Sequence, residues 1–380
     1  MIVIRFSAPV RPARRLGRAF GLAVLAGTAL GSISSLPLAA QEQALSDRVI
    51  PPSRQGQVDS TKADTPNGGR PEIHTVDEMA QAALYTAPGA KAYAALAAQA
   101  SDGMWPVTLA YRCKYPRGGT SIKAPVPQPM EVFDGVYSIG DDANNIWAID
   151  TDEGIILLDA LTNEEDARNI IVRHMEQVGL DPKRIRIIIV SHNHLDHFGG
   201  APYLKSISGA RIGASTADWD GDSIYGRMPP RGEGDFDISD GEQITLGGRT
   251  VTAYLTPGHT AGTLSFVFPV SDKGTPHVAA LFGGQGKPRK MEDYVQFLEG
   301  LQHFSEQTDR MQADVILSNH TVGDDGLTRI AQLAQRKAGE PNPYVVGREG
   351  VIRYDALFRA CLSADIDQMV WDKAHLASAK

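Results

Sequence analysis

Three histidines and one aspartate lie within six consecutive positions, directly after a strongly apolar segment. That segment, Ile185–Val190, is almost continuously apolar and rich in isoleucine, which predicts a buried strand. In the following pattern, H-x-H-x-D-H, His192 and His194 point the same way if the backbone stays extended. Asp196 and His197 then turn towards a neighbouring point. Because zinc prefers imidazole nitrogen and carboxylate oxygen, the pattern predicts a metal site at the end of a strand.

Two further histidines follow predicted strands later in the chain. His259 lies in the glycine- and proline-containing turn Thr256–Thr263. His320 ends the segment Leu317–His320, just past another apolar run. A lone histidine at such a place is more often structural. Beside the first motif, however, both are predicted to be metal ligands.

Asp159 ends the predicted strand Gly154–Leu158 and has two interpretations. Its carboxylate could accept a hydrogen bond from a metal-binding histidine and so orient the metal loop. It could equally be a local carboxylate of a turn or of a helix N-terminus. The sequence alone leaves both open.

The order of the remaining elements predicts a mixed α/β class. A strand is expected over Val132–Ile139, followed by a hairpin of Ile146–Ile149 and Gly154–Leu158. A helix is expected from Asn163, its cap, to Gln177. Further strands are predicted at Arg211–Gly213, Glu242–Leu246, Thr250–Leu255, Thr263–Phe268, Val278–Phe282 and Val315–Leu317, and further helices at Met291–Phe304, Gly326–Lys337 and Gly350–Leu362.

Residues 1–40 have the order of a secretory signal peptide. A basic segment precedes an apolar segment from Ala19 to about Leu38, and small residues stand before Gln41. We therefore expect a bacterial periplasmic protein. The pair Arg14-Arg15 leaves twin-arginine export open beside the general route, and an uncleaved anchor is the alternative.

The next segments differ in composition. Residues 41–72 are rich in Pro, Gly, Ser, Gln and charge, which predicts a disordered leader. Residues 73–127 are expected to form a helical N-terminal extension. It starts with the capping box Thr75–Glu78 and an alanine-rich pattern that runs to about Ala100, with a break at Pro88-Gly89. Met104–Lys123 shows no clear period.

The charge restricts the partners. After residue 40 the chain has 32 basic and 45 acidic residues, a formal charge of −13. Such a surface repels nucleic acid and anionic membranes. We therefore expect a small-molecule substrate, no nucleic acid, and no membrane contact once the signal is removed. The oligomeric state is not indicated.

The chain has two cysteines, Cys113 and Cys361. In an oxidising compartment they could form a disulfide that joins the two ends of the mature chain. Two separate buried thiols are the alternative, since pairing does not follow from sequence.

Taken in order, Asp159, H-x-H-x-D-H, Thr-Pro-Gly-His259 and Asn-His320 resemble the metallo-β-lactamase superfamily over roughly Met130 to His320. The resemblance implies an α/β fold, a four-layer αβ/βα sandwich over residues 128–375. It places the metals in a cleft between the sheet edges. It says much less about the substrate.

The ligand set indicates which part of the superfamily the chain resembles most. Superfamily hydrolases such as glyoxalase II and the acyl-homoserine lactonases carry a bridging aspartate after the strand that follows the His259 motif. The first two lactamase subclasses carry a cysteine there. Here that strand continues into Gly283-Gly284-Gln285. What remains is similar to the third subclass of class B metallo-β-lactamases. That subclass implies two Zn²⁺ per chain, one held by His192, His194 and His259 and the other by Asp196, His197 and His320.

The same resemblance implies a periplasmic zinc hydrolase that confers antibiotic resistance. It would open the amide bond of a β-lactam ring by attack of a metal-bridging hydroxide, with Asp196 as the catalytic residue that orients the hydroxide. The alternative is a zinc hydrolase of a different ester, lactone or amide. A non-hydrolytic metal-binding or redox protein is a further possibility.

One departure concerns the substrate carboxylate. The third subclass usually binds it with a short serine-containing loop after the strand Val278–Phe282. The corresponding run, Gly283–Lys290, has no serine. Lys287, Arg289 and Lys290 are predicted to bind the carboxylate by charge instead, unless they are ordinary solvated loop residues.

Overall fold

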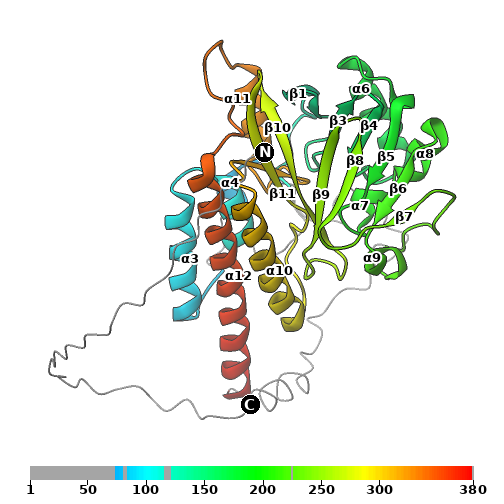
Figure 1. Ribbon diagram of the computed structural model, residues 1–380. Coiled ribbons are helices and arrows are strands. Elements are labelled where there is room, and N and C mark those ends of the chain that lie inside the picture. The colour runs from blue at the N-terminus through cyan, green and yellow to red at the C-terminus, as the bar shows by residue number, and fades with distance from the viewer. Residues whose placement is uncertain (1–72, 80–83, 115–120, 224–225, 379–380) are drawn as a thin grey trace, which may run out of the picture. The chain divides into compact units, whose positions relative to one another are not determined.

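The computed structural model describes residues 73–79, 84–114, 121–223 and 226–378 (Figure 1). The expected signal peptide and leader, residues 1–72, lie outside the described residues. Among the helices described, none combines the length and the apolar composition that crossing a membrane requires.

The first sheet has seven strands, hydrogen-bonded in chain order. The first four are antiparallel, and the pairs from β4 to β7 are parallel. The expected single strand Val132–Ile139 is wrong, because the chain turns at Asp134-Gly135 and Gly135 has a φ of 70°. The strands are β1 (Met130–Phe133), β2 (Val136–Ser138), β3 (Trp147–Thr151), β4 (Gly154–Leu158), β5 (Ile185–Ile189), β6 (Arg211–Ala214) and β7 (Phe236–Asp237).

The second sheet has five strands in the order β12-β11-β10-β9-β8. Only β11 and β12 pair in parallel, and the other neighbours are antiparallel. The strands are β8 (Glu242–Leu246), β9 (Arg249–Leu255), β10 (Leu264–Asp272), β11 (Thr275–Phe282) and β12 (Val315–Ser318).

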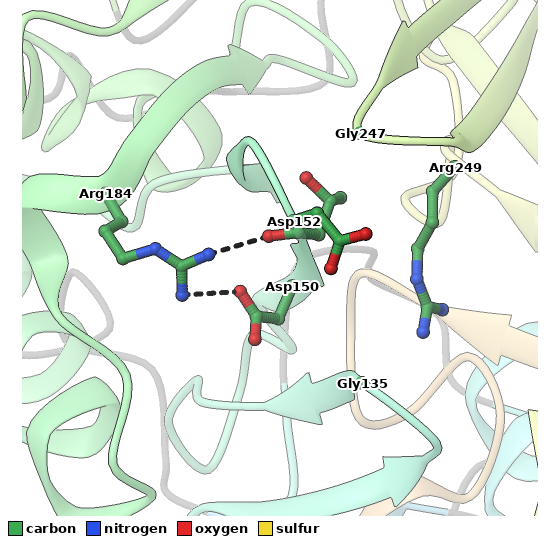
Figure 2. A pocket seen from close by; sticks show the side chains of 7 residues that line it. Gly135, Asp150, Asp152, Arg184, Gly247 and Arg249 are labelled. Atoms are coloured by element: carbon green, nitrogen blue, oxygen red, sulfur yellow. Dashed lines mark hydrogen bonds and ion pairs between the residues drawn. The ribbon is translucent and has the colours of Figure 1, made fainter.

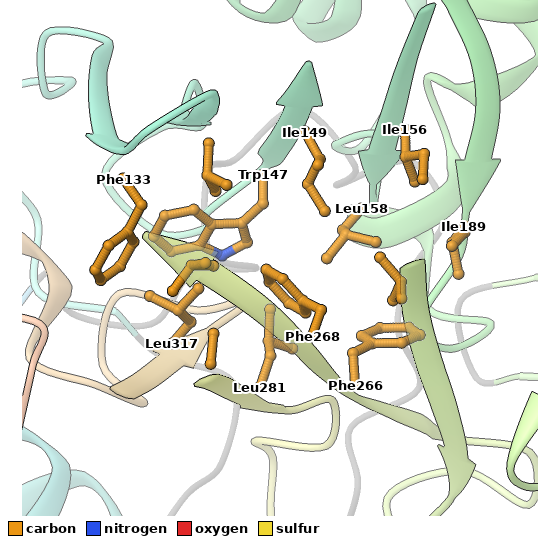
Figure 3. Packing of buried hydrophobic residues seen from close by; sticks show 14 of the residues in the cluster. Phe133, Trp147, Ile149, Ile156, Leu158, Ile189, Phe266, Phe268, Leu281 and Leu317 are labelled. Carbon is orange, nitrogen blue, oxygen red and sulfur yellow. The ribbon is translucent and has the colours of Figure 1, made fainter. Parts of the chain in front are cut away.

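Successive side chains of each strand point to opposite faces of the sheet, so each sheet has one face towards the other sheet and one face towards the helices. Trp147 and Leu158 of the first sheet pack with Phe266 and Leu281 of the second in one buried cluster between the sheets (Figure 3). Their strand neighbours face outwards: Phe282, for example, belongs to the cluster beneath the helices of the second sheet. The result is the expected sandwich of two sheets between helical layers.

Helices cover both outer faces. The first sheet carries one continuous helical segment made of α5 (Glu164–Asp166), a π-helical stretch (Ala167–Val172) and α6 (Arg173–Gln177), together with α8 (Ala201–Ser208). Asn163 caps this segment as expected, accepting a bond of 2.9 Å from the Asp166 N–H. The remaining elements here are a 3₁₀ turn (Pro182–Arg184), α7 (Leu195–Phe198) and α9 (Thr216–Asp220). The second sheet is covered by α10 (Met291–Arg310) and α12 (Gly347–Ser378), with α11 (Gly326–Ala334) between them in the chain.

The segment before the sheets forms α2 (Val76–Met79), α3 (Pro88–Ser101) and α4 (Pro106–Cys113). Helix α3 packs along the long helix α12 (Figure 1). Helix α4 was not predicted, because the polar residues Thr108 and Arg112 are buried together with its apolar residues, so its buried positions do not follow an apolar pattern. Cys113, at the end of α4, is disulfide-bonded to Cys361 of α12, which settles the pairing.

Loss of this disulfide is expected to lower the free energy of unfolding by about 2–5 kcal/mol, because the bond restricts a very long loop of the unfolded chain. Urea denaturation of the Cys113→Ser/Cys361→Ser variant measures the change. The wild type under reducing conditions should match the variant. An unchanged midpoint in both would show that packing alone holds α4 on α12.

Candidate metal centre

Six side chains converge in two groups of three at one end of the sandwich. Within each group the potential ligand atoms all lie within 4.8 Å of one another. The first group is His192, His194 and His259, and the second is Asp196, His197 and His320. The six predicted ligands are therefore brought together, and in the predicted partition.

Strand ends from both sheets supply these ligands. His192 follows β5 of the first sheet, while His259 and His320 follow β9 and β12 of the second. The two sheets are also joined here, because the Leu264 N–H donates to the Ser191 carbonyl over 2.7 Å. A buried carboxylate, Asp218, adds a further link: it accepts bonds from the Asn193 N–H at 3.1 Å and the Gly262 N–H at 2.9 Å.

The histidine rings are oriented from outside the centre. Nδ1 of His259 donates to the Gly286 carbonyl over 2.9 Å, and Nδ1 of His197 donates to Asp159 over 2.7 Å. Nδ1 of His192 lies 3.1 Å from the Ser191 hydroxyl, which donates to Asp159 over 2.8 Å. With Nδ1 donating outwards, Nε2 of these three rings faces inwards, and it carries the lone pair whenever the ring is neutral.

The inward nitrogens are close together. Nε2 of His192 lies 3.0 Å from Nε2 of His259, and Nε2 of His197 lies 3.1 Å from Nε2 of His320. Lone pairs that converge in this way suit a shared cation, and three nitrogens or an aspartate with two nitrogens suit zinc. The residues present therefore fit a zinc ion in each group.

Asp159 lies directly behind the ligands. Besides His197, its carboxylate accepts bonds from the Ser191 N–H at 2.7 Å and from the Asn319 amide at 3.3 Å. Its backbone has a φ of 66°, in the left-handed region that aspartate tolerates better than most residues. Its contact with Nδ1 of His197 is the one that the first of its two interpretations predicts.

Burial keeps most of the rings neutral. It lowers the pKa of His192 and of His259 well below the ordinary value, and that of His194 and His320 to about 4. Burial also acts against protonation of His197, yet the carboxylates of Asp196 and Asp159 together raise its pKa to about 10. Although burial acts to raise the pKa of Asp196, His197 holds it well below its usual range.

A family model for the metallo-beta-lactamase superfamily matches residues 139–272. This match identifies residues 139–272 as a metallo-beta-lactamase superfamily domain. Among solved structures, a subclass B3 metallo-beta-lactamase of Bradyrhizobium japonicum is 25% identical with a TM-score of 0.53; the match covers 67% of this chain and 97% of that one. A metallo-beta-lactamase from Cronobacter sakazakii is 27% identical with a TM-score of 0.51, covering 67% and 96%.

Curated relatives are similar over a shorter stretch. A hydroxyacylglutathione hydrolase of Cereibacter sphaeroides is 32% identical over 84 residues, which is 22% of this chain and 29% of that protein. The chain thus spans less than a third of the length of the first such relatives.

Two asparagines that lie beside the candidate ligands were missed in the sequence. The Asn144 amide donates to Oδ2 of Asp196 over 3.0 Å, and the Asn319 amide donates to the Gly283 carbonyl over 2.8 Å. Asn319 was visible only as the neighbour of His320. Asn144 lies 52 positions before Asp196, so no local pattern could have paired them.

The three basic residues predicted to bind a carboxylate are placed differently. The ammonium of Lys287 lies 2.9 Å from Asp365, and both side chains are only 9% exposed, so Lys287 is already paired inside the protein. Lys290 is exposed at the N-cap of α10. Arg289 is exposed. Burial is the main cause of the lowered pKa of His194, and the charge of Arg289 makes a smaller contribution in the same direction. The charge of Arg289 therefore acts electrostatically on His194.

A separate hollow of about 510 Å³ lies at the other ends of the strands (Figure 2). Its lining includes Asp150 and Arg184, which form an ion pair of 2.9 Å, and Arg249, which donates to the Asp134 carbonyl. None of the side chains of the two candidate metal groups lines this hollow, so it is separate from the candidate metal centre.

Zinc binding is expected to release about one proton from the protein, because His197 alone among the five histidines of the centre has a raised pKa. At about pH 5.5–6.5 a zinc-bound water still holds its proton. In that range the second group should bind zinc about tenfold more weakly for each unit by which the pH falls.

Calorimetric titration in buffers of different ionisation enthalpy counts the protons released. The first group should bind without releasing any, since burial keeps its rings neutral. Release of three or more protons, or of none, would contradict the assigned protonation states.

Proposed function

We propose that this protein is a zinc-dependent hydrolase that binds two Zn²⁺ per chain and opens the amide bond of β-lactams. The proposal depends mainly on the ligand set. Three histidines and an Asp-His-His group converge, and no carboxylate follows β11, where the chain continues as Gly283-Gly284. A Cβ on Gly284 would lie 2.7 Å from Cβ of His259, so a larger side chain does not fit there.

Zinc in both groups would supply Lewis acidity to polarise a carbonyl and to activate a water molecule. The chain's own residues do the positioning. Asn144 holds the carboxylate of Asp196, which is partly exposed and lies beside His197 at 3.4 Å. From there Asp196 would orient the attacking water and accept its proton. Asp159 would keep the His197 ring in place through the reaction.

A periplasmic location is part of the same proposal. The pattern of residues 1–40 supports it, as does the Cys113–Cys361 disulfide, because structural disulfides persist in oxidising compartments. The proposed substrate class is supported separately, by the similarity to two solved metallo-beta-lactamases that are at least 25% identical to this chain.

A hydroxyacylglutathione hydrolase activity is the second candidate. It is favoured by the sequence matches to proteins of that name. Against it stands the glycine pair after β11, where glyoxalase II carries its bridging aspartate. A panel of one penicillin, one cephalosporin, one carbapenem, a lactone and a glutathione thioester separates the candidates.

We expect zinc-loaded protein to hydrolyse at least one β-lactam of that panel. His194→Ala and Asp196→Ala each remove one of three ligands, so either should reduce turnover by orders of magnitude. His303→Ala is the matched control: His303 lies on α10 and pairs with Asp240 at 3.0 Å, outside both groups. Clear activity on the thioester or lactone with none on any β-lactam would overturn the proposal.

Arg289→Ala is expected to raise KM for an anionic β-lactam more than it lowers kcat. An exposed cation beside the centre stabilises the bound substrate and the transition state alike. Steady-state kinetics measures both constants. Lys287→Ala should instead lower thermal stability, because it leaves Asp365 buried without its ion pair. A KM unchanged by loss of Arg289 would remove this residue from the substrate site.

A further inference from the structure

The chain between β11 and α10 connects the metal centre with the N-terminal helices. In this loop the Gly286 carbonyl accepts the Nδ1 proton of His259. The preceding residue, Gln285, is fully buried and makes two contacts with Arg112 of α4. Nη1 of Arg112 donates to the Gln285 carbonyl over 3.2 Å, and Nη2 donates to its Oε1. A side chain from outside the sandwich thus holds the peptide next to the one that orients a metal ligand.

Arg112 is itself held firmly. Its side chain is buried, and its guanidinium carbon lies 3.1 Å from the ring centroid of Phe358 on α12. The next residue, Cys113, is tied to α12 by the disulfide. Burial lowers the pKa of Arg112 to about 10, so the guanidinium stays charged at neutral pH. A buried charge with these partners is costly to move, which makes Arg112 a rigid support.

The loop has a second attachment on the other side of Gly286. Lys287 pairs with Asp365 of α12, and Asp365 also accepts a bond of 2.8 Å from the hydroxyl of Tyr85, just before α3. The space for the His259 ring is also narrow, because a Cβ on Gly286 would lie 2.7 Å from Cε1 of His259. A small shift of this loop would therefore turn or displace the ring.

We infer that Arg112 is a positioning residue that fixes the orientation of His259 through Gln285 and Gly286, and thereby sets the zinc affinity of the three-histidine group. The N-terminal helices then act as part of the metal centre's support. This inference rests on the metal site of the proposed function, and it is independent of the substrate.

The test compares Arg112→Lys with the wild type in three measurements. Lysine keeps the charge but loses the two-pronged contact. We expect zinc affinity of the first group to fall about tenfold, as for other residues that orient metal ligands, while the Asp196 group is unaffected. In metal-free protein, the NMR signal of the hydrogen-bonded His259 Nδ1 proton should be lost through faster exchange. Thermal unfolding checks the fold.

Arg336→Lys is the matched control. Arg336 forms a two-pronged pair with Asp272 at 2.6 and 2.7 Å and contacts neither ligand loop. It should lose stability but keep both zinc affinities and the His259 signal. Gln285→Met replaces the test variant if Arg112→Lys does not fold. It removes the side-chain contact and keeps the carbonyl contact, so a smaller loss of affinity is expected.

Equal zinc affinity and an unchanged His259 signal in Arg112→Lys, or in a folded Gln285→Met when the lysine variant fails, would overturn the inference. A loss confined to thermal stability, as in Arg336→Lys, would do the same. Failure of the wild type on every β-lactam would overturn the proposed substrate and leave this result standing, because none of the three measurements uses a substrate.

Discussion

The centre depends on one buried carboxylate. Asp159 is almost fully buried, and its two oxygens connect the end of β4 to the histidine loop after β5 and to the loop after β12. Through the Ser191 hydroxyl it reaches His192, and directly it reaches His197, one histidine of each group. A single negative charge thus sets the proton positions on rings of both groups, and the inward lone pairs follow from this.

The second sheet contributes the other two histidines of the centre, and the helical layer helps to position one of them. His259 and His320 come from β9 and β12, but the loop that orients His259 is held by Arg112 and by the Lys287–Asp365 pair. The disulfide joins the helices that carry Arg112 and Asp365. Helices α3, α4 and α12 therefore bear on the metal site, although none of them carries a metal ligand in either group.

Much of this could be predicted from local sequence. The isoleucine-rich strand β5 with H-x-H-x-D-H after it led to the fold and to the sheet edge at which all six predicted ligand side chains, His259 and His320 among them, come together. The features that were not predicted depend mostly on partners that are far away in the sequence. Helix α4 buries the polar residues Thr108 and Arg112 against parts of the chain that are far away in sequence, and the Lys287–Asp365 pair spans 78 positions. The hairpin at Gly135 was missed because alternation continues through a two-residue turn.

The central claim is that the two groups of side chains each hold one zinc ion. Anomalous diffraction at the zinc edge, on crystals of zinc-loaded protein, tests it directly. The account predicts two peaks per chain about 3.5–4 Å apart, as in other two-metal sites. One should be bound by Nε2 of His192 and His259 together with His194, and the other by Asp196, His197 and His320. A single peak, or a peak whose ligands mix the two groups, would contradict the account.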